Sequence, residues 1–160
     1  MLMEVKDLRF LCGKWRGFGL AGYTDIIPVS YSEILTFEYD TYKDLIHYTQ
    51  FTKRTDSFKN GATLHMESGF IRKSDSGAIE LSNAQNNGRV EVMILDDSEL
   101  SGDIKNLIFR SKLFGNDPRM IISQRVFTYT DNKLSYEMKM ATMKNTNLST
   151  HLTCELIREA

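Results

Sequence analysis

The sequence has few of the features that mark a membrane protein, a secreted protein or a metal-cluster protein. Its two cysteines, Cys12 and Cys154, stand near opposite ends of the chain and form no Cys-x-x-Cys pattern. No apolar run approaches the length of a membrane span, and the first residues have no signal-peptide apolar region. We therefore expect reduced thiols, no membrane partner and a cytoplasmic location.

The chain also lacks a surplus of either charge. It has 20 Lys and Arg residues against 21 Asp and Glu residues, a formal net charge of -1. Proteins that bind nucleic acids usually have a basic surface, so we expect no nucleic-acid partner. A chain of 160 residues is most simply one domain, and we expect residues 1–160 to form it.

Residues for a self-sufficient catalytic site are scarce. The only histidines are His47, His65 and His151, and no two of them have the spacing of a local metal site. No Gly-x-Ser-x-Gly, P-loop or Gly-x-Gly-x-x-Gly pattern is present. If the protein is an enzyme, a bound cofactor supplies the difficult chemistry. From the residues alone, His47 is a surface or cross-strand residue, and His65 lies either in the barrel wall or in a ligand pocket.

Turn signals divide the chain into segments rich in β-branched and aromatic residues. These signals are Asn60-Gly61, Asp75-Ser76-Gly77, Asn86-Asn87-Gly88, Thr130-Asp131-Asn132 and Asn145-Thr146-Asn147. They indicate about ten strands at a spacing of roughly 10 to 15 residues, with no room for crossover helices. A sandwich or a barrel would satisfy this pattern, and the short loops favour the barrel. We predict an all-β fold: a single closed antiparallel up-and-down barrel of about ten strands, similar to the lipocalins, able to enclose one small ligand.

The segment from Gly13 to Tyr23 has a small residue at every second position. Trp15, the only tryptophan, is followed at this spacing by Gly17, Gly19 and Ala21. In a strand these positions share one face, which we expect to be the inner face. Repeated glycine weakens a strand and needs a reason. Tight packing in a sharply coiled first strand is one reason, and close approach of the backbone to an enclosed ligand is the other.

This segment, Gly13-x-Trp15-x-Gly17-x-Gly19-x-Ala21-x-Tyr23, resembles the signature of the nitrobindins, which are haem-containing ten-stranded β-barrels. Further similar motifs follow in order over nearly the whole chain. They are Tyr31-x-Glu33, Tyr48-Thr49-Gln50, His65-x-Glu67-Ser68-Gly69-Phe70-x-Arg72, Gly77-x-x-Glu80, Ala84-Gln85-x-x-Gly88-x-Val90-Glu91-Val92, Arg125, Leu134-Ser135-Tyr136, Met140-Ala141-Thr142 and His151-Leu152.

The resemblance implies a haem b group at one end of the barrel, with His151 as the proximal iron ligand. It also implies reversible nitric oxide binding and a haem-dependent isomerisation of peroxynitrite to nitrate. His65 would border the pocket as a polar group without binding iron. The positions that the resemblance places at the cofactor are Trp15, Gly17, Gly19, Tyr23, Thr24, Asp25, Ile26, His65 and His151.

The sequence departs from the nitrobindin pattern beside the expected haem. Where the family reads Tyr-Pro-Thr-Ile, this chain reads Tyr23-Thr24-Asp25-Ile26. A carboxylate at Asp25 would repel the haem propionates if it lay close to them. The alternative function is a haem-free barrel for a fatty acid or another small hydrophobic molecule. The chain lacks the Arg-x-Tyr pattern of intracellular fatty-acid-binding proteins, which counts against that alternative.

The direction of His151 is a second open question. Strict alternation places His151 on the same face as Thr153 and Glu155, opposite the apolar residues of the last strand. A β-bulge between Thr150 and Thr153 would turn His151 inward. An apolar outer face covered by a second subunit, as in a homodimer, would also reconcile the pattern.

Overall fold

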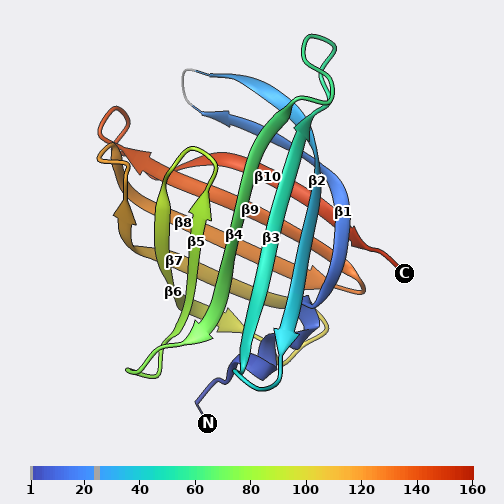
Figure 1. Cartoon of the computed structure of the whole chain (residues 1–160), viewed down its shortest axis with the longest axis vertical. Coiled ribbons are helices and arrows are strands. Elements are labelled where there is room, and N and C mark those ends of the chain that lie inside the picture. Colours follow the sequence, from blue (N-terminus) through green and yellow to red (C-terminus); the bar gives the residue numbers. More distant parts are fainter. Residues whose placement is uncertain (1, 24–25) are drawn as a thin grey trace.

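The computed structural model describes residues 2–23 and 26–160 (Figure 1). Thr24 and Asp25, two of the predicted cofactor positions, lie outside the described residues. Within the described ranges the chain forms one 3-10 helix and ten strands. Their bounds are η1 Val5–Leu11, β1 Gly13–Tyr23, β2 Ile26–Asp40, β3 Leu45–Arg54, β4 Thr63–Lys73, β5 Ile79–Gln85, β6 Val90–Glu99, β7 Lys105–Gly115, β8 Met120–Thr130, β9 Lys133–Thr142 and β10 Ser149–Arg158.

The strands close into a barrel. Every strand pairs antiparallel with its sequence neighbour, and β1 pairs with β10 to complete the ring. This is the up-and-down arrangement, in which short loops join adjacent strands, and it confirms the predicted fold class. Among the described residues, no helix is long and apolar enough to cross a membrane.

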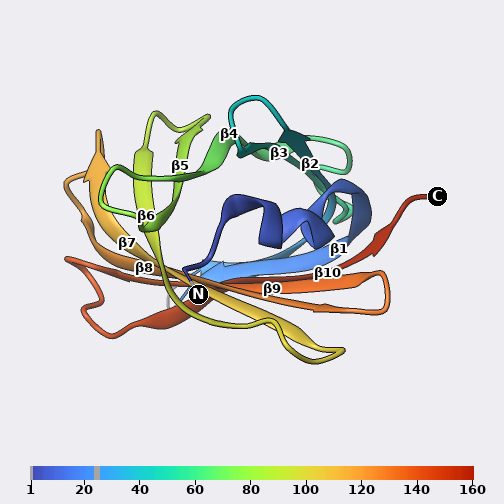
Figure 2. The ribbon, with the colours of Figure 1, turned by 90° about the horizontal axis from the view of Figure 1, so that it is seen from below.

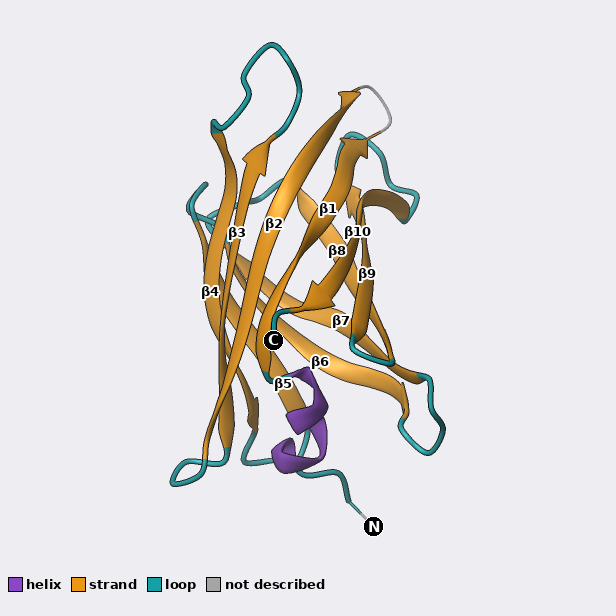
Figure 3. Ribbon diagram, turned by 90° about the vertical axis from the view of Figure 1, so that its right-hand side faces the viewer, coloured by secondary structure: helices purple, strands orange, loops and turns teal. Residues whose placement is uncertain are grey.

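The helix η1 closes one end of the barrel. Figure 2 shows it across the opening, and Figure 3 shows it at the end opposite the loop between β3 and β4. Its apolar side chains Val5, Leu8 and Leu11 are fully buried. The ring of Trp15 lies beside it and donates a 2.8 Å hydrogen bond from Nε1 to the Leu11 carbonyl. Burial of these side chains is the main force that holds the helix in place, because the hydrophobic effect scales with the apolar area removed from water.

Close packing explains the glycines of β1. A Cβ atom at Gly17 would lie 1.8 Å from the carbonyl oxygen of Glu155 on β10. A Cβ atom at Gly19 would lie 2.4 Å from Cζ of Tyr31. Glycine is therefore required at both positions by the neighbouring strand and by a core tyrosine. Of the two reasons left open by the sequence, tight packing applies to Gly17 and Gly19.

Candidate functional site

A partly open cavity of about 270 Å³ occupies the barrel at the end away from η1. This volume is just below the usual range for small-molecule sites, roughly 300 to 1,000 Å³. Its described lining combines apolar, amide and basic side chains and contains no carboxylate. The lining residues are Ala21, Tyr31, Gln50, Thr52, Leu64, His65, Gln85, Asn87, Arg89, Met138, Met140, His151 and Leu152.

An irregularity in β10 turns His151 toward this cavity. The register between β10 and β9 shifts between Thr150 and Leu152. As a result, His151 and the adjacent Leu152 both line the cavity, although neighbours in a regular strand face opposite sides. Beyond the shift the alternation resumes, with Cys154 buried and Glu155 exposed. A bulge was one of the two explanations that the sequence left open, and the structure has the irregularity at the predicted place.

The imidazole of His151 is held in one orientation and one tautomer. Its Nδ1 lies 2.8 Å from the carbonyl oxygen of Gly22, so Nδ1 carries the proton and donates it. The Tyr23 ring packs against it in a T-shaped arrangement, with 6.0 Å between the ring centroids. Burial lowers the pKa of His151; the hydrogen bond to Gly22 opposes this effect, and the positive charge of Arg89 adds to it. The ring is therefore neutral at pH 7, and its Nε2 makes no hydrogen bond within the described part of the chain.

These residues fit a haem group. A haem iron requires one axial donor from the protein and an apolar surface for the macrocycle. His151 offers a neutral nitrogen whose partner nitrogen is fixed by a carbonyl, the usual support for a metal-bound histidine. Leu64, Met138, Met140 and Leu152 supply apolar surface in the same cavity. The described residues hold no group of three or more His, Cys, Asp or Glu side chains that could bind a bare ion.

His65 enters the cavity from β4 and is tied to a buried ion pair. Its Nε2 lies 3.1 Å from Oε2 of Glu67. The guanidinium of Arg125 binds both carboxylate oxygens of Glu67, and the Tyr48 hydroxyl donates a 2.9 Å hydrogen bond to Oε1. Burial would raise the pKa of Glu67, but the charge of Arg125 and the bonds from His65 and Arg125 hold it below its usual range. A second buried carboxylate, Glu91, accepts a 3.1 Å hydrogen bond from Arg125.

A third buried carboxyl group, Glu33, lies directly behind the cavity lining. The Gln50 amide, which lines the cavity, donates a 3.1 Å hydrogen bond to Oε1 of Glu33. The Tyr136 hydroxyl donates to Oε2. Burial raises the pKa of Glu33 to about 7, and the bonds from Tyr136, Cys154 and Gln50 offset only part of this shift.

The structure brings together some of the predicted cofactor positions and separates others. His65 and His151 line one cavity, and Tyr23 contacts the His151 ring. Trp15 lies at the opposite end, against η1. Gly17 and Gly19 pack against β10 and Tyr31 and do not line the cavity. Ile26 begins β2. The cofactor contacts assigned to these residues stay predictions.

Sequence reasoning missed Arg89 as a site residue. Tyr31, Gln50 and Gln85 belong to motifs of the resemblance, so a signal for them existed. Arg89 occupies an unspecified position of its motif and reaches the cavity only because the β5–β6 turn places it there. The remaining histidine, His47, bonds to Ser68 on the outer face, 3.0 Å from Nε2 to Oγ.

The fold and the cavity define a barrel with room for a small molecule, in which no described residue forms a hydrogen bond with Nε2 of His151. Residues 4–158 match the family model of the THAP4-like, heme-binding beta-barrel domain. The chain belongs to this family.

Named relatives and a solved structure cover almost the same length. An Arabidopsis thaliana protein named as a peroxynitrite isomerase is 36% identical over 141 residues, covering 88% of this chain and 81% of the relative. The peroxynitrite isomerase 2 of Mycobacterium marinum is 29% identical over 160 residues, covering 98% and 96%. The crystal structure of Rv2717c from M. tuberculosis superimposes with a TM-score of 0.85 at 26% identity, covering 98% of this chain and 97% of the other.

Proposed function

We propose that this chain is a cytoplasmic haem b protein that binds nitric oxide and isomerises peroxynitrite to nitrate. The observation that carries the proposal is the placement of His151 in the cavity of a heme-binding barrel, with Nδ1 bonded to the Gly22 carbonyl and Nε2 without a hydrogen bond to any described residue. The names of the relatives support the choice of reaction. A haem-free carrier of fatty acids is less well supported, because the matching family is a heme-binding one.

Each nearby residue has a role that follows from its contacts. His151 would hold the iron of the haem through Nε2, and the Gly22 carbonyl would keep the ring proton on Nδ1. Met138, Met140 and Leu152 would exclude water from the macrocycle. His65, held by Glu67, offers a polar group that can form a hydrogen bond to a bound ligand. When bound, the haem supplies an iron that acts as a Lewis acid.

The test is hemin loading followed by peroxynitrite decay. We expect the purified chain to develop a Soret band with hemin and to convert peroxynitrite to nitrate faster than free hemin does. His151→Ala should lose the Soret shift, whereas His47→Ala, on the outer face, should load as the parent does. If His151→Ala loads hemin with an unchanged spectrum, His151 is not the ligand. If the parent chain binds no hemin, the function itself is wrong.

A homodimer also stays a prediction. Phe18 and Leu20 of β1 and Ile157 of β10 are exposed on the outer face of the barrel. These side chains are the apolar surface on which the predicted second copy would pack. Sedimentation velocity of the parent and of Phe18→Ser tests this, and a monomeric parent contradicts it.

A further inference from the structure

We infer that Arg89 is the anion-recognition residue of the cavity and holds an oxyanion beside His151. The inference adds a ligand-binding residue to the proposed function. It depends on that function only for the protein loaded with haem. The oxyanion is either a propionate of the porphyrin or a small anionic ligand, and both present the same acceptor to a guanidinium. No motif of the sequence marks Arg89, so the inference rests on its position and its bonds.

The position of Arg89 is fixed by the tight turn before β6. Its backbone N–H donates a 3.0 Å hydrogen bond to Oδ1 of Asn87, and its carbonyl accepts a 2.9 Å bond from the N–H of Gln85. Gly88 adopts a φ of 92°, which glycine tolerates without strain. The turn therefore places the side chain at the cavity, in the same lining as His151 and near enough for its charge to act on the His151 ring.

The charge of Arg89 is only partly compensated. Its Nε and Nη2 donate to Oδ2 of Asp117 at 3.1 and 2.8 Å. The same carboxylate accepts bonds from Nε and Nη2 of Arg119 at 2.9 and 3.0 Å. Two guanidinium groups thus share one carboxylate, and the cluster keeps a net positive charge. The bonds from Arg119 and then Arg89 keep the pKa of Asp117 below its usual range despite its burial, so the carboxylate stays ionised.

Arg89 is the member of this cluster that faces the cavity. Its side chain is 13% exposed, whereas that of Arg119 is 74% exposed and does not line the cavity. Nη1 of Arg89 has no hydrogen-bond partner in residues 2–23 and 26–160, and it is therefore available to a ligand. The described lining offers no carboxylate that would compete for it. A partly desolvated guanidinium next to neutral and apolar groups favours an anion over a neutral molecule of the same size.

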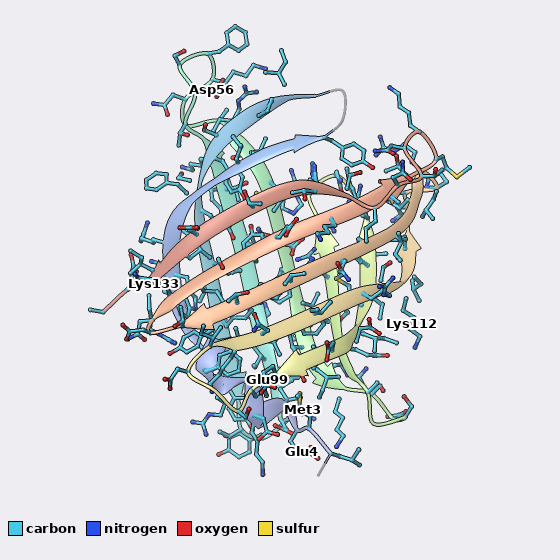
Figure 4. The ribbon with its side chains drawn as sticks, turned by 180° about the vertical axis from the view of Figure 1, so that it is seen from behind. Met3, Glu4, Asp56, Glu99, Lys112 and Lys133 are labelled. Atoms are coloured by element: carbon cyan, nitrogen blue, oxygen red, sulfur yellow. The ribbon has the colours of Figure 1, made fainter. Side chains whose placement is uncertain are left out.

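The variants are chosen to separate this role from folding and from overall charge. Arg89→Leu removes the guanidinium and leaves Asp117 bound to Arg119. Lys112→Leu removes the same single charge from the outer face of β7, where Lys112 points away from the barrel and pairs with Glu80 at 3.3 Å (Figure 4). Asp117→Asn removes the carboxylate that binds Arg89 and should therefore increase anion affinity, whereas Arg89→Leu should decrease it. Arg89→Lys keeps the positive charge and should therefore retain part of the anion affinity that Arg89→Leu loses.

The first measurement uses the unloaded protein and anilinonaphthalene sulfonate, a dye that joins a sulfonate to an apolar body. We expect Arg89→Leu to weaken dye binding about tenfold. Lys112→Leu should leave it unchanged, and Asp117→Asn should strengthen it. Thermal unfolding of each variant shows that the comparison is made between folded chains.

The second measurement uses the loaded protein and distinguishes the two sources of the oxyanion. If Arg89 binds a propionate, Arg89→Leu should weaken hemin and leave hemin dimethyl ester unchanged. If it binds a small anion, the variant should weaken nitrite binding to the ferric protein and leave neutral imidazole unchanged. Either pattern supports the inference. Affinities of Arg89→Leu within twofold of the parent for the dye, hemin and nitrite overturn it.

The two measurements also separate this inference from the proposed function. A chain that loads no porphyrin but binds the dye through Arg89 disproves the haem function and leaves the inference standing. If the chain loads hemin through His151 but Arg89→Leu has no effect in any assay, the haem function stands and the inference about Arg89 is wrong.

Discussion

The Nδ1 of His151 on β10 lies 2.8 Å from the carbonyl oxygen of Gly22 on β1, so the ring is oriented by the backbone of the adjacent strand. A backbone carbonyl accepts this hydrogen bond whatever side chain stands at position 22. The orientation of the predicted iron ligand thus depends on the pairing of the first and last strands, and distortion of β1 would rotate or release the ring.

Replacement of Gly17 by alanine is expected to unfold or strongly destabilise the barrel. The added Cβ would lie 1.8 Å from the Glu155 carbonyl oxygen, and backbone must move to relieve that contact. We expect a loss of at least about 3 kcal/mol in the free energy of unfolding. Gly22→Ala is the control, because its Cβ would lie 3.6 Å from Pro28, an ordinary contact. Urea unfolding of both variants provides the measurement, and similar midpoints would contradict the packing argument.

Glu33 is expected to give the barrel a pH-dependent stability. Its pKa is about 7 in the folded chain and near its ordinary 4.5 when unfolded. Between these values the folded chain retains a proton that the unfolded chain has lost. Its contribution is therefore complete below pH 4.5 and is lost as the pH rises to about 7, by about 3 kcal/mol in total.

The measurement for Glu33 is the difference in unfolding free energy between the parent and Glu33→Gln across this pH range. The difference is needed because the lowered pKa of His151 gives a slope of the opposite sign in the parent and the variant alike. We expect the variant to lose the downward slope that Glu33 causes. Parallel curves for the two chains would show that the carboxyl group is ionised in the folded state.

Replacement of Arg125 is expected to lower the stability of the barrel strongly. Arg125 is 3% exposed and binds Glu67 and Glu91. Arg125→Met leaves two buried carboxylates without their cation, a loss of about 3 to 5 kcal/mol. Adding Glu67→Gln to Arg125→Met should recover part of this loss, because one of those carboxylates is then removed. Chemical unfolding of the single and double variants tests this, and strictly additive losses would mean that the residues are not coupled.

Asp25→Thr is expected to hold or strengthen hemin affinity, because threonine is the residue of the resembling family and carries no charge. Hemin titration of the parent and the variant, at low and high salt, measures the effect. A charge effect should shrink at high salt. A weaker Asp25→Thr complex would show that the carboxylate contributes favourably.

The fold was predictable because local signals agree along the chain. The turn residues, the alternation of the strands and the small-residue spacing after Trp15 each indicate a barrel, and short loops order its strands. Burial of charge was not predictable in this way. Glu67 and Arg125 are 58 residues apart, and only the closed ring brings them together. The alternation of a strand shows which face of the sheet a carboxylate occupies. It does not show whether a cation from another strand lies close to that carboxylate.

The resemblance placed His65 and His151 at the cavity, where the structure has them, but Trp15, Gly17 and Gly19 of its signature do not line the cavity. Residues placed by a local irregularity or by a turn were not predictable. His151 was identified by resemblance, but its direction depends on a register shift for which the residues around it give no signature. Arg89 reaches the cavity through the conformation of a turn and is then shared between Asp117 and the cavity. Both features depend on backbone geometry that period-two patterns do not encode.

The pairing of β1 with β10 also determines when the barrel can close during synthesis. Of the ten strands, β1 is made first and β10 last, so the sheet keeps two unpaired edges until β10 has been made. Such edges can pair with other chains. Loss of β10 would therefore leave a ring open along the bare backbone of Gly17 and Gly19, with no histidine at position 151 to complete the cavity.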